Sequence, residues 1–520
     1  MTNPRNGADA LCDTLLAGGV DVCFSNPGTS EMHFVAALDR KPAMRCILGL
    51  FEGVVTGAAD GYARMAEKPA CTLLHLGPGL ANGLANVHNA KRAHTPMVNI
   101  VGDHATYHLQ YDAPLTSDIE MLARPMSHWV QTTKHADDVS RDAARAIEAA
   151  QTAPGQIATL ILPADAAWGE TTSALVKPAK PAARAKTSSA KVSAAVAAIR
   201  SGKRVMLLLS DAALKADTLV TAGRIVEATG IRMLAQQSNK RIERGAGRVT
   251  IERVPYPVDQ AVALLKDVEV LILVGAKAPV GFFAYPGKPS VMTQPASAII
   301  ELAAREDDLT HALRWLADEL RINSKAAPKV AELLRPGLPT GKLTPDAVLA
   351  AVTALMPENA IIADESVTAG RSLFQRTAGA PPHDFLQLTG GAIGLGLPMA
   401  VGAAVACPDR KVIGLQADGS GMYTVQALWT MARENLDCVI TIFANRSYAI
   451  LHHELRNVGA GEAGKNARAM LDLDNPALDW VSIAKGMGLE ACRTTTGEEY
   501  SKAFRSAVSR RGPYLIEAVV

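Results

Sequence analysis

The sequence predicts an α/β protein of three domains, each built on a mostly parallel sheet flanked by helices. Short apolar runs with the composition of strands alternate with longer runs of helical periodicity along nearly the whole chain, which is the pattern of parallel sheets. The 520 residues also exceed what one hydrophobic core organises. Two proline-containing stretches, 171–190 and 326–345, read as linkers between the three parts.

Composition and charge exclude several classes of protein. Hydrophobic residues make up 48% of the chain and charged residues 20%, which is typical of a globular enzyme and unlike a disordered chain. The net charge of +2 gives no electrostatic attraction to nucleic acid or an anionic membrane, and no apolar run is long enough to span a bilayer. The start does not resemble a signal peptide, and the seven cysteines show no zinc or disulfide pattern. We expect a cytoplasmic protein without nucleic-acid or membrane partners.

The first domain is predicted over residues 1–170. Strands alternate with helices there, so the loops that follow the strands should gather at one edge of a parallel sheet, where ligands bind in such folds. Those loops cover 26–29, 51–52, 75–79 and 102–108 and contain several titratable residues. The strands are predicted at Val20–Phe24, Arg45–Leu48, Ala70–Leu74 and Met97–Val101, with helices that include Ala8–Ala17, Phe51–Met65 and Gly83–His94.

The last domain, predicted over 343–520, contains the most informative stretch. A strand at Val412–Leu415 leads to Asp418, and after a helix a second strand at Cys438–Phe443 leads to Asn445. A right-handed crossover places the ends of two such parallel strands close together. Carboxylate, amide and carbonyl oxygens suit Mg²⁺, so Asp418, Asn445 and the backbone carbonyl of Ser447 are predicted metal ligands. For either side chain alone, a helix cap or a turn is the alternative.

These residues carry a family resemblance. The segments Asp418-Gly419-Ser420 and Asn445-Arg446-Ser447 resemble the diphosphate–magnesium motif of thiamine diphosphate (ThDP) enzymes, and the chain looks most like the acetohydroxyacid synthase, pyruvate decarboxylase and benzoylformate decarboxylase group. The resemblance implies ThDP and Mg²⁺ as cofactors and the domain order pyrimidine-binding, central, diphosphate-binding. It also implies a homodimer that shares its active sites between subunits, often paired into a homotetramer.

The resemblance assigns roles to individual residues. Glu52 corresponds to the family's glutamate that hydrogen-bonds the aminopyrimidine ring of ThDP. His75 and Thr29 resemble a histidine and a serine of the benzoylformate decarboxylase site, and His104 lies roughly where pyruvate decarboxylases have a histidine pair. These four are the predicted catalytic residues. The predicted cofactor contacts are Asn26, Pro27, Gly28, Glu52, Ser366, Gly391, Ile393, Gly419, Ser420, Tyr448, Ala449 and Ile450.

The central domain, over 190–325, is predicted to be structural. No G-x-G-x-x-G follows its strand at Val268–Val274, which disfavours nicotinamide binding. The corresponding domain of acetohydroxyacid synthases holds FAD, but no such contact pattern is recognisable in this sequence. FAD is therefore not expected, although it stays an open alternative.

The predicted function is a non-oxidative, ThDP- and Mg²⁺-dependent decarboxylase of a small-molecule 2-oxo acid, similar to benzoylformate decarboxylase. Leu451 supports this, because pyruvate decarboxylases carry a glutamate there. Ala284 weakens it, because the benzoylformate decarboxylase loop has a second histidine at that place. The first alternative is a carboligase of the acetolactate synthase type. A 2-hydroxyacyl-CoA lyase and a non-catalytic ThDP-binding subunit are the others.

Overall fold

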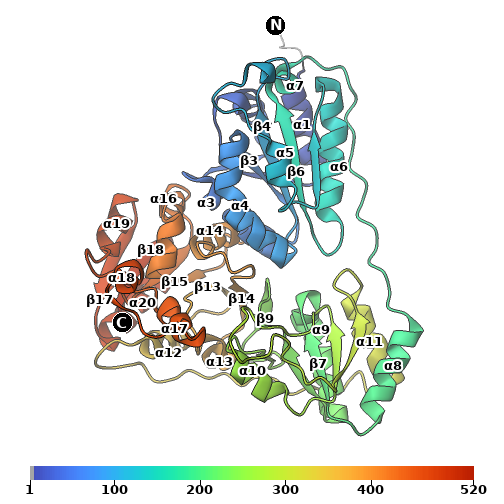
Figure 1. The fold of residues 1–520 in the computed structure, drawn as a ribbon, viewed down its shortest axis with the longest axis vertical. Coiled ribbons are helices and arrows are strands. Elements are labelled where there is room, and N and C mark those ends of the chain that lie inside the picture. The colour runs from blue at the N-terminus through green and yellow to red at the C-terminus, as the bar shows by residue number, and fades with distance from the viewer. Residues whose placement is uncertain (1–4) are drawn as a thin grey trace.

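The computed structural model describes residues 5–520, which form three sheets of six, five and seven strands (Figure 1). The α/β class with three mostly parallel sheets is confirmed. In Figure 1 the blue N-terminal part lies at the top, the green central part at the lower right and the orange C-terminal part at the left. None of the helices among residues 5–520 is both long enough and apolar enough to cross a membrane.

The first sheet is entirely parallel, with the strand order β2-β1-β3-β4-β6-β5. Its central strands β3 and β4 are buried along their whole length, as expected for a parallel sheet covered on both faces. The helices α1, α2, α6 and α7 cover one face, and α3, α4 and α5 cover the other. The strands are β1 (Val22–Asn26), β2 (Arg45–Leu48), β3 (Ala70–Leu74), β4 (Met97–Asp103), β5 (Trp129–Thr132) and β6 (Ile157–Pro163); the helices are α1 (Gly7–Ala17), α2 (Met32–Asp39), α3 (Glu52–Ala66), α4 (Leu76–Ala93), α5 (Ile119–Ala123), α6 (Val139–Gln151) and α7 (Ala164–Trp168).

The prediction of a loop at 75–79 is wrong, because α4 begins directly after His75. Proline and two glycines argue against a helix in the sequence, yet Pro78 lies in the first turn, where its missing N–H costs nothing. At Gly77 a Cβ would overlap the hydroxyl of Ser117, so a larger residue there would displace that side chain. His75 therefore caps a helix instead of lying within a loop.

The central sheet is also parallel, with the order β10-β8-β7-β11-β12. Residues 171–188, which contain no helix or strand, connect the first sheet to it along one side of the molecule (Figure 1). The strands are β7 (Val205–Leu209), β8 (Arg232–Ala235), β10 (Glu252–Arg253), β11 (Val270–Val274) and β12 (Ala298–Ala303); the helices are α8 (Ser189–Arg200), α9 (Ala216–Thr229), α10 (Val258–Leu265) and α11 (Leu309–Glu319).

The last sheet has the order β17-β18-β16-β15-β13-β14-β9. Its edge strand β9 comes from the middle of the chain and pairs antiparallel with β14, through Ile242 and Phe385 among others. The strands are β9 (Ile242–Arg244), β13 (Ala360–Glu365), β14 (His383–Gln387), β15 (Val412–Ala417), β16 (Cys438–Ala444), β17 (Glu490–Thr494) and β18 (Tyr514–Val519); the helices are α12 (Pro345–Leu355), α13 (Leu373–Arg376), α14 (Gly396–Ala406), α15 (Asp418–Gly421), α16 (Ala427–Arg433), α17 (Ala449–Asn457), α18 (Lys465–Leu471), α19 (Trp480–Gly486) and α20 (Gly497–Val508).

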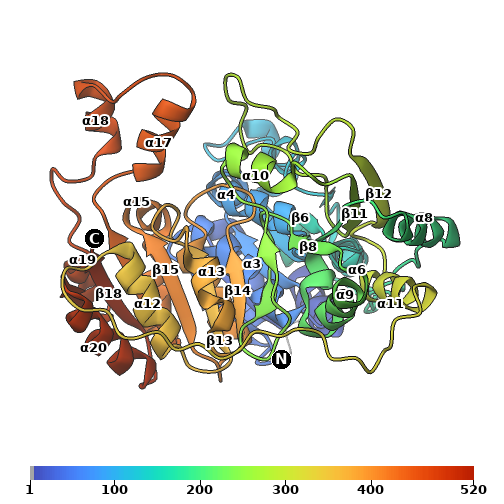
Figure 2. The same cartoon turned by 90° about the horizontal axis from the view of Figure 1, so that it is seen from below.

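The two faces of the last sheet belong to different hydrophobic cores. Under α12 and α20, its buried side chains are continuous with the core of the central sheet. Under α14, α16 and α19, they are continuous with the core beneath α3 and α4 of the first sheet. The last sheet therefore shares one core with the central sheet and another with the first sheet (Figure 2).

Helices α3 and α14 pack against each other with their backbones in close approach. A Cβ at Gly402 would overlap the carbonyl oxygen of Ala58, and one at Gly61 would overlap the carbonyl oxygen of Met399. Both positions are buried, so neither helix can move aside without opening the shared core. The two glycines thus fix how the first and last sheets meet.

Replacing Gly402 with alanine is expected to lower the free energy of unfolding by about 1–3 kcal/mol, the usual cost of inserting a methyl group into a packed interface. Urea titration followed by circular dichroism measures the change. Gly486→Ala is the control, because a Cβ there meets no atom within 4 Å. An equal stability for both variants would contradict the close approach of α3 and α14.

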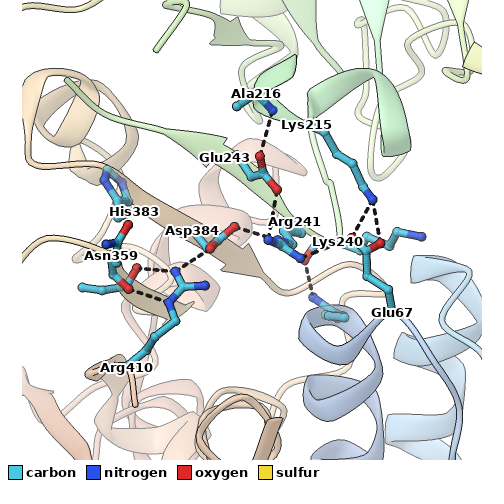
Figure 3. A network of polar contacts seen from close by, with 12 residues as sticks. Glu67, Lys215, Ala216, Lys240, Arg241, Glu243, Asn359, His383, Asp384 and Arg410 are labelled. Carbon is cyan, nitrogen blue, oxygen red and sulfur yellow. Dashed lines mark hydrogen bonds and ion pairs between the residues drawn. The ribbon is translucent and has the colours of Figure 1, made fainter. Parts of the chain in front are cut away.

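A network of charged side chains joins the three parts of the chain on one side of β9 and β14 (Figure 3). Arg241 contacts Asp384 at 2.6 Å, Glu243 at 3.0 Å and Glu67, at the end of α3, at 3.4 Å. Asp384 also accepts from Arg410 at 2.5 Å. The carboxylate of Asp384 is nearly fully buried, and the two guanidinium groups compensate for its desolvation.

Candidate active site

The predicted metal ligands come together at the carboxyl ends of β15 and β16. One oxygen of Asp418 accepts a hydrogen bond from the backbone N–H of Gly419 at 2.8 Å, and the other accepts from that of Arg446 at 2.6 Å. Because Arg446 follows Asn445 directly, Asp418 lies against the loop that carries Asn445 and Ser447. Burial raises the pKa of the Asp418 carboxyl. A cation bound beside this carboxyl would lower that pKa again.

The loop after β16 is held in a defined shape. The Asn445 side-chain oxygen accepts from the N–H of Ser447 at 3.1 Å, and Tyr448 donates its N–H to Leu471 O at 2.8 Å. Within residues 5–520 there is no group of three or more His, Cys, Asp or Glu side chains placed to hold a metal. A magnesium site at this edge would therefore use amide and carbonyl oxygens beside the one carboxylate.

The segment after β15 is closely packed around its glycine. Gly419 and Ser420 are buried, and a Cβ at Gly419 would overlap the ring of Tyr448. Ser420 accepts from the Gln416 side chain at 2.5 Å. Tyr448 caps α17, whose first turn contains Ala449 and Ile450.

The glycine-rich loop between β14 and α14 is fixed from two sides. Gly391 has a φ of +83°, which favours glycine, and it is exposed while Ile393 is half-buried. From α4, the Asn89 side chain donates to Ala392 O at 2.7 Å. From β13, the carboxylate of Glu365 accepts from the N–H groups of Gly394, at 2.6 Å, and Gly396.

Glu365 is a site residue that the sequence did not reveal. Burial raises the pKa of its carboxyl to about 7, although the backbone N–H groups that it accepts lower it. The neighbouring Ser366, predicted to contact the cofactor, is fully buried and donates its hydroxyl to Asp364. Glu365 shapes the glycine-rich loop, whereas Ser366 shapes its own strand end.

The predicted pyrimidine-side residues lie at the carboxyl edge of the first sheet. Glu52 begins α3 and is mostly buried, and its side chain accepts from Asn82 at 3.0 Å. A Cβ at Gly79, in the first turn of α4, would come within 2.9 Å of the Glu52 carboxylate. The glycine therefore leaves room for the carboxylate beside α4.

His75 is oriented by Glu31, which the sequence also did not single out. The His75 Nδ1 lies 2.8 Å from the Glu31 carboxylate, and the same oxygen accepts from Gly28 N–H at 2.7 Å. The imidazole packs on Gly28, where a Cβ would overlap the ring, so His75 lies against the 26–29 loop with Asn26 and Pro27. A carboxylate only accepts, so Nδ1 carries the proton and Nε2 is left available. Thr29, next in the loop, is exposed.

His104 follows β4 at the same edge. The backbone N–H of His104 donates to the Asp103 carboxylate at 2.7 Å, and burial raises the pKa of Asp103. The Nε2 atom of His104 is buried and has no hydrogen-bond partner in the described part of the chain. The His108 ring lies 5.5 Å away, centroid to centroid, so the two histidines form a neighbouring pair although they are not adjacent in sequence.

Within the part of the chain that the structure describes, the predicted pyrimidine-side residues make no polar contact with the two loops that carry the predicted metal ligands. Among residues 5–520, no hydrogen bond or ion pair links Glu52, His75 or His104 to the loops that carry Asp418 and Asn445. The first domain does contact the glycine-rich loop, because Asn86 of α4 donates to Gly53 O, next to Glu52, at 2.8 Å and to Gly394 O at 3.2 Å.

Two family models match this chain, one in the first domain and one in the last. The model of the thiamine pyrophosphate enzyme N-terminal TPP binding domain matches residues 5–135, and that of the C-terminal TPP binding domain matches 369–518. Thiamine pyrophosphate is another name for ThDP. The chain belongs to the thiamine diphosphate enzymes.

Similar proteins span the full length of this ThDP enzyme. It is 53% identical to the "Putative acetolactate synthase large subunit IlvX" of Mycobacterium tuberculosis over 99% of both chains. It is 29% identical to benzoylformate decarboxylase of Pseudomonas aeruginosa, over 98% of this chain and 97% of the other. The structure of a ThDP-dependent 4-hydroxybenzoylformate decarboxylase from Rhodococcus jostii RHA1 superposes with a TM-score of 0.85 at 24% identity, over 99% of both chains.

The residues at the last sheet fit the diphosphate end of ThDP. A buried carboxylate, an amide oxygen and a backbone carbonyl form the hard oxygen set that Mg²⁺ takes together with phosphate oxygens. Beside them, the ring of Tyr448 packs directly on Gly419. Asp418, Asn445 and Ser447 would hold the ion, and Gly419 and Ser420 would face the diphosphate.

Replacing Asp418 with alanine is expected to weaken Mg²⁺-dependent binding of ThDP by at least about 10-fold, since loss of a metal ligand should cost no less than loss of its supporting groups. Calorimetric titration of ThDP with and without Mg²⁺ measures this effect. Asp409→Ala is the control, because Asp409 is exposed and lies outside the site. Unchanged Mg²⁺-dependent affinity in D418A would refute the assignment of the ion to this loop.

Proposed function

We propose that this enzyme is a ThDP- and Mg²⁺-dependent, non-oxidative decarboxylase of 2-oxo acids. One observation carries the proposal: the His75 imidazole is held by the buried Glu31 carboxylate at the sheet edge that also carries Glu52. A decarboxylase must replace the departing CO₂ with a proton, and an oriented imidazole is suited to supply it near neutral pH.

The roles of the residues follow from their positions. Bound ThDP would supply the electron sink that accepts the electrons left by CO₂. Glu52 would hold a proton against the aminopyrimidine ring, while Gly391 and Ile393 would contact the ring from the other domain. His75, with His104 and Thr29 nearby in the neighbouring loops, would exchange a proton with the substrate.

The proposal includes an assembly. Residues 1–170 would bind the pyrimidine and residues 343–520 the diphosphate, with 190–325 as a structural domain. Glu52, His75 and His104 make no hydrogen bond or ion pair with the loops of Asp418 and Asn445 within residues 5–520. We therefore propose that these groups meet across a homodimer, in which the first domain of one subunit faces the last domain of the other. A homotetramer in the cytoplasm is the expected form.

Carboligation of the acetolactate synthase type is the second candidate. The name of the 53% identical relative favours it.

The central domain offers little space for FAD. The Arg305 guanidinium occupies the crevice at the carboxyl ends of β7 and β11, where it donates to Gly275 O at 3.0 Å and to Ser210. The cavity that remains there measures about 10 Å³.

The test is release of CO₂ from a panel of 2-oxo acids by the full-length protein with ThDP and Mg²⁺, with analysis of the products. An aldehyde as the main product supports the decarboxylase, and an acyloin or 2-hydroxy-2-acyl acid supports the carboligase. No CO₂ from any 2-oxo acid, despite tight ThDP binding, would overturn both and direct the search to 2-hydroxyacyl-CoA cleavage or a non-catalytic role.

A further inference from the structure

A cavity of about 240 Å³ lies between the central domain and α17. Tyr256 and Tyr285, from the segments beside α10, form one wall, and His453 and Glu454 of α17 form another. Arg371, in the connection between β13 and α13, completes it. Figure 2 shows α10 and α17 at the same side of the molecule, above the last sheet. The residues named so far as site residues do not line this cavity.

Cationic groups outnumber anionic groups in this cavity. The cationic lining residues are Lys288, Arg371 and Arg456, and the anionic ones are Asp259 and Glu454. Asp259 pairs with Lys288 at 2.6 Å. Glu454 accepts from the side chain of Asn457, another lining residue, at 3.3 Å. Both carboxylates are thus engaged by neighbouring lining groups.

Arg371 is the cation left without a carboxylate. It is exposed, and it makes no ion pair and no side-chain hydrogen bond with any part of the chain that the structure describes. Its charge reaches the cavity, because Arg371 lowers the pKa of His453 and also acts on Tyr256. A guanidinium group in this situation favours a carboxylate or a phosphate, which it can bind through two parallel hydrogen bonds.

His453 adds a neutral donor to the same wall. Arg456 donates to its Nδ1 at 2.7 Å, and a guanidinium group has no acceptor, so the proton of the neutral ring is on Nε2. Burial, and then the charges of Arg371 and Arg456, lower the pKa of His453, which keeps the ring neutral at pH 7. The cavity therefore offers N–H donors from both Arg371 and His453.

The walls of the cavity are extensions of the elements that carry the cofactor contacts. Arg371 comes five residues after Ser366, and His453 lies one helical turn after Ala449, in the helix that begins just beyond the metal loop. Tyr256 contacts the ring of Phe282 at 5.5 Å between centroids, and a Cβ at Gly391 would lie 2.6 Å from that ring. The aromatic rings thus connect the cavity to the glycine-rich loop.

We propose that this cavity, through Arg371 with Arg456 and His453 Nε2, binds a second anionic group of the substrate, remote from the 2-oxo acid group that reacts. The proposal rests on the proposed function and specifies its substrate class: a 2-oxo acid with a distal carboxylate or phosphate.

Two kinds of measurement on the full-length protein with ThDP and Mg²⁺ test this inference. The first compares kcat/KM for 2-oxoglutarate and for 2-oxohexanoate, which has a similar length but no distal charge. The wild type should prefer the dianion, and Arg371→Gln should reduce that preference about tenfold, as expected for one lost charge-assisted hydrogen bond. Arg511→Gln is the matched control, because Arg511 is exposed near the C-terminus and does not line the cavity.

The second measurement does not depend on turnover. Calorimetry should detect glutarate binding to the wild type and to R511Q, with about tenfold weaker binding to R371Q. Tighter binding of 2-phosphoglycolate than of glutarate would identify phosphate as the distal group. If no 2-oxo acid reacts but R371Q still loses glutarate binding, the anion site stands and the decarboxylase proposal fails. Decarboxylation without preference for the dianion, together with equal glutarate binding in all three proteins, would overturn the anion site alone.

Discussion

Glu52→Gln is expected to lower kcat by about 10²–10⁴-fold, the range lost when a positioned acid–base group is removed. Glutamine preserves the shape of the side chain and can still bond Asn82 through its oxygen, so α3 should begin as before. What it cannot do is exchange a proton with the aminopyrimidine. The expected signature is lost turnover with ThDP binding reduced by much less.

Steady-state CO₂ release and calorimetric ThDP titration measure the two quantities separately. Glu358→Gln is the matched control, because Glu358 is an exposed glutamate on the loop before β13. If E52Q retained more than about a tenth of the wild-type kcat, Glu52 would not act as an acid–base group and its assignment would be wrong.

Arg64→Met should cause the largest loss of stability, about 3–5 kcal/mol, because it leaves a buried carboxylate without its partner. Arg64 and Asp60 form a fully buried ion pair in α3, with hydrogen bonds of 2.7 and 2.9 Å. Arg64 also donates to Gln387 O at 2.7 Å, to Thr389 at 3.1 Å and to Lys240 O at 3.2 Å. One guanidinium group therefore connects all three parts of the chain.

Thermal and urea unfolding, followed by circular dichroism, measure the loss. The double variant Asp60→Leu/Arg64→Met distinguishes a lost network from an unpaired charge, because it removes both charges and should be more stable than R64M alone. Arg511→Met is the surface control. A loss below about 1 kcal/mol in R64M would show that the buried pair contributes no more than an exposed one.

Local sequence patterns predicted much of the fold. Arg45–Leu48 and Ala70–Leu74 have the predicted limits, and the strand before Asp418 is two residues longer than predicted. The closeness of Asp418 to the Asn445 loop was predictable because both lie on one strand–helix–strand unit, whose handedness is nearly invariant. In such a unit, the order of the elements along the chain determines which ends meet.

Features that depend on distant segments were not predictable. β9 has three residues, too few for a period-two pattern, and becomes a strand only because β14 offers a free edge. Glu31 resembles an ordinary residue of a first helical turn until His75, 44 positions later, is placed beside it. Glu365 likewise acquires its role from backbone N–H groups of the glycine-rich loop.

The crossing of β9 has a consequence for how the protein can be divided. A fragment that starts at the linker 326–345 would contain the diphosphate motif but would lack the partner strand of β14. The row of unpaired N–H and C=O groups on β14 would then be open to pairing with other chains, which leads to aggregation. A soluble ThDP-binding fragment must therefore carry Ile242–Arg244, and exchange of the central domain between homologues must exchange this strand with it.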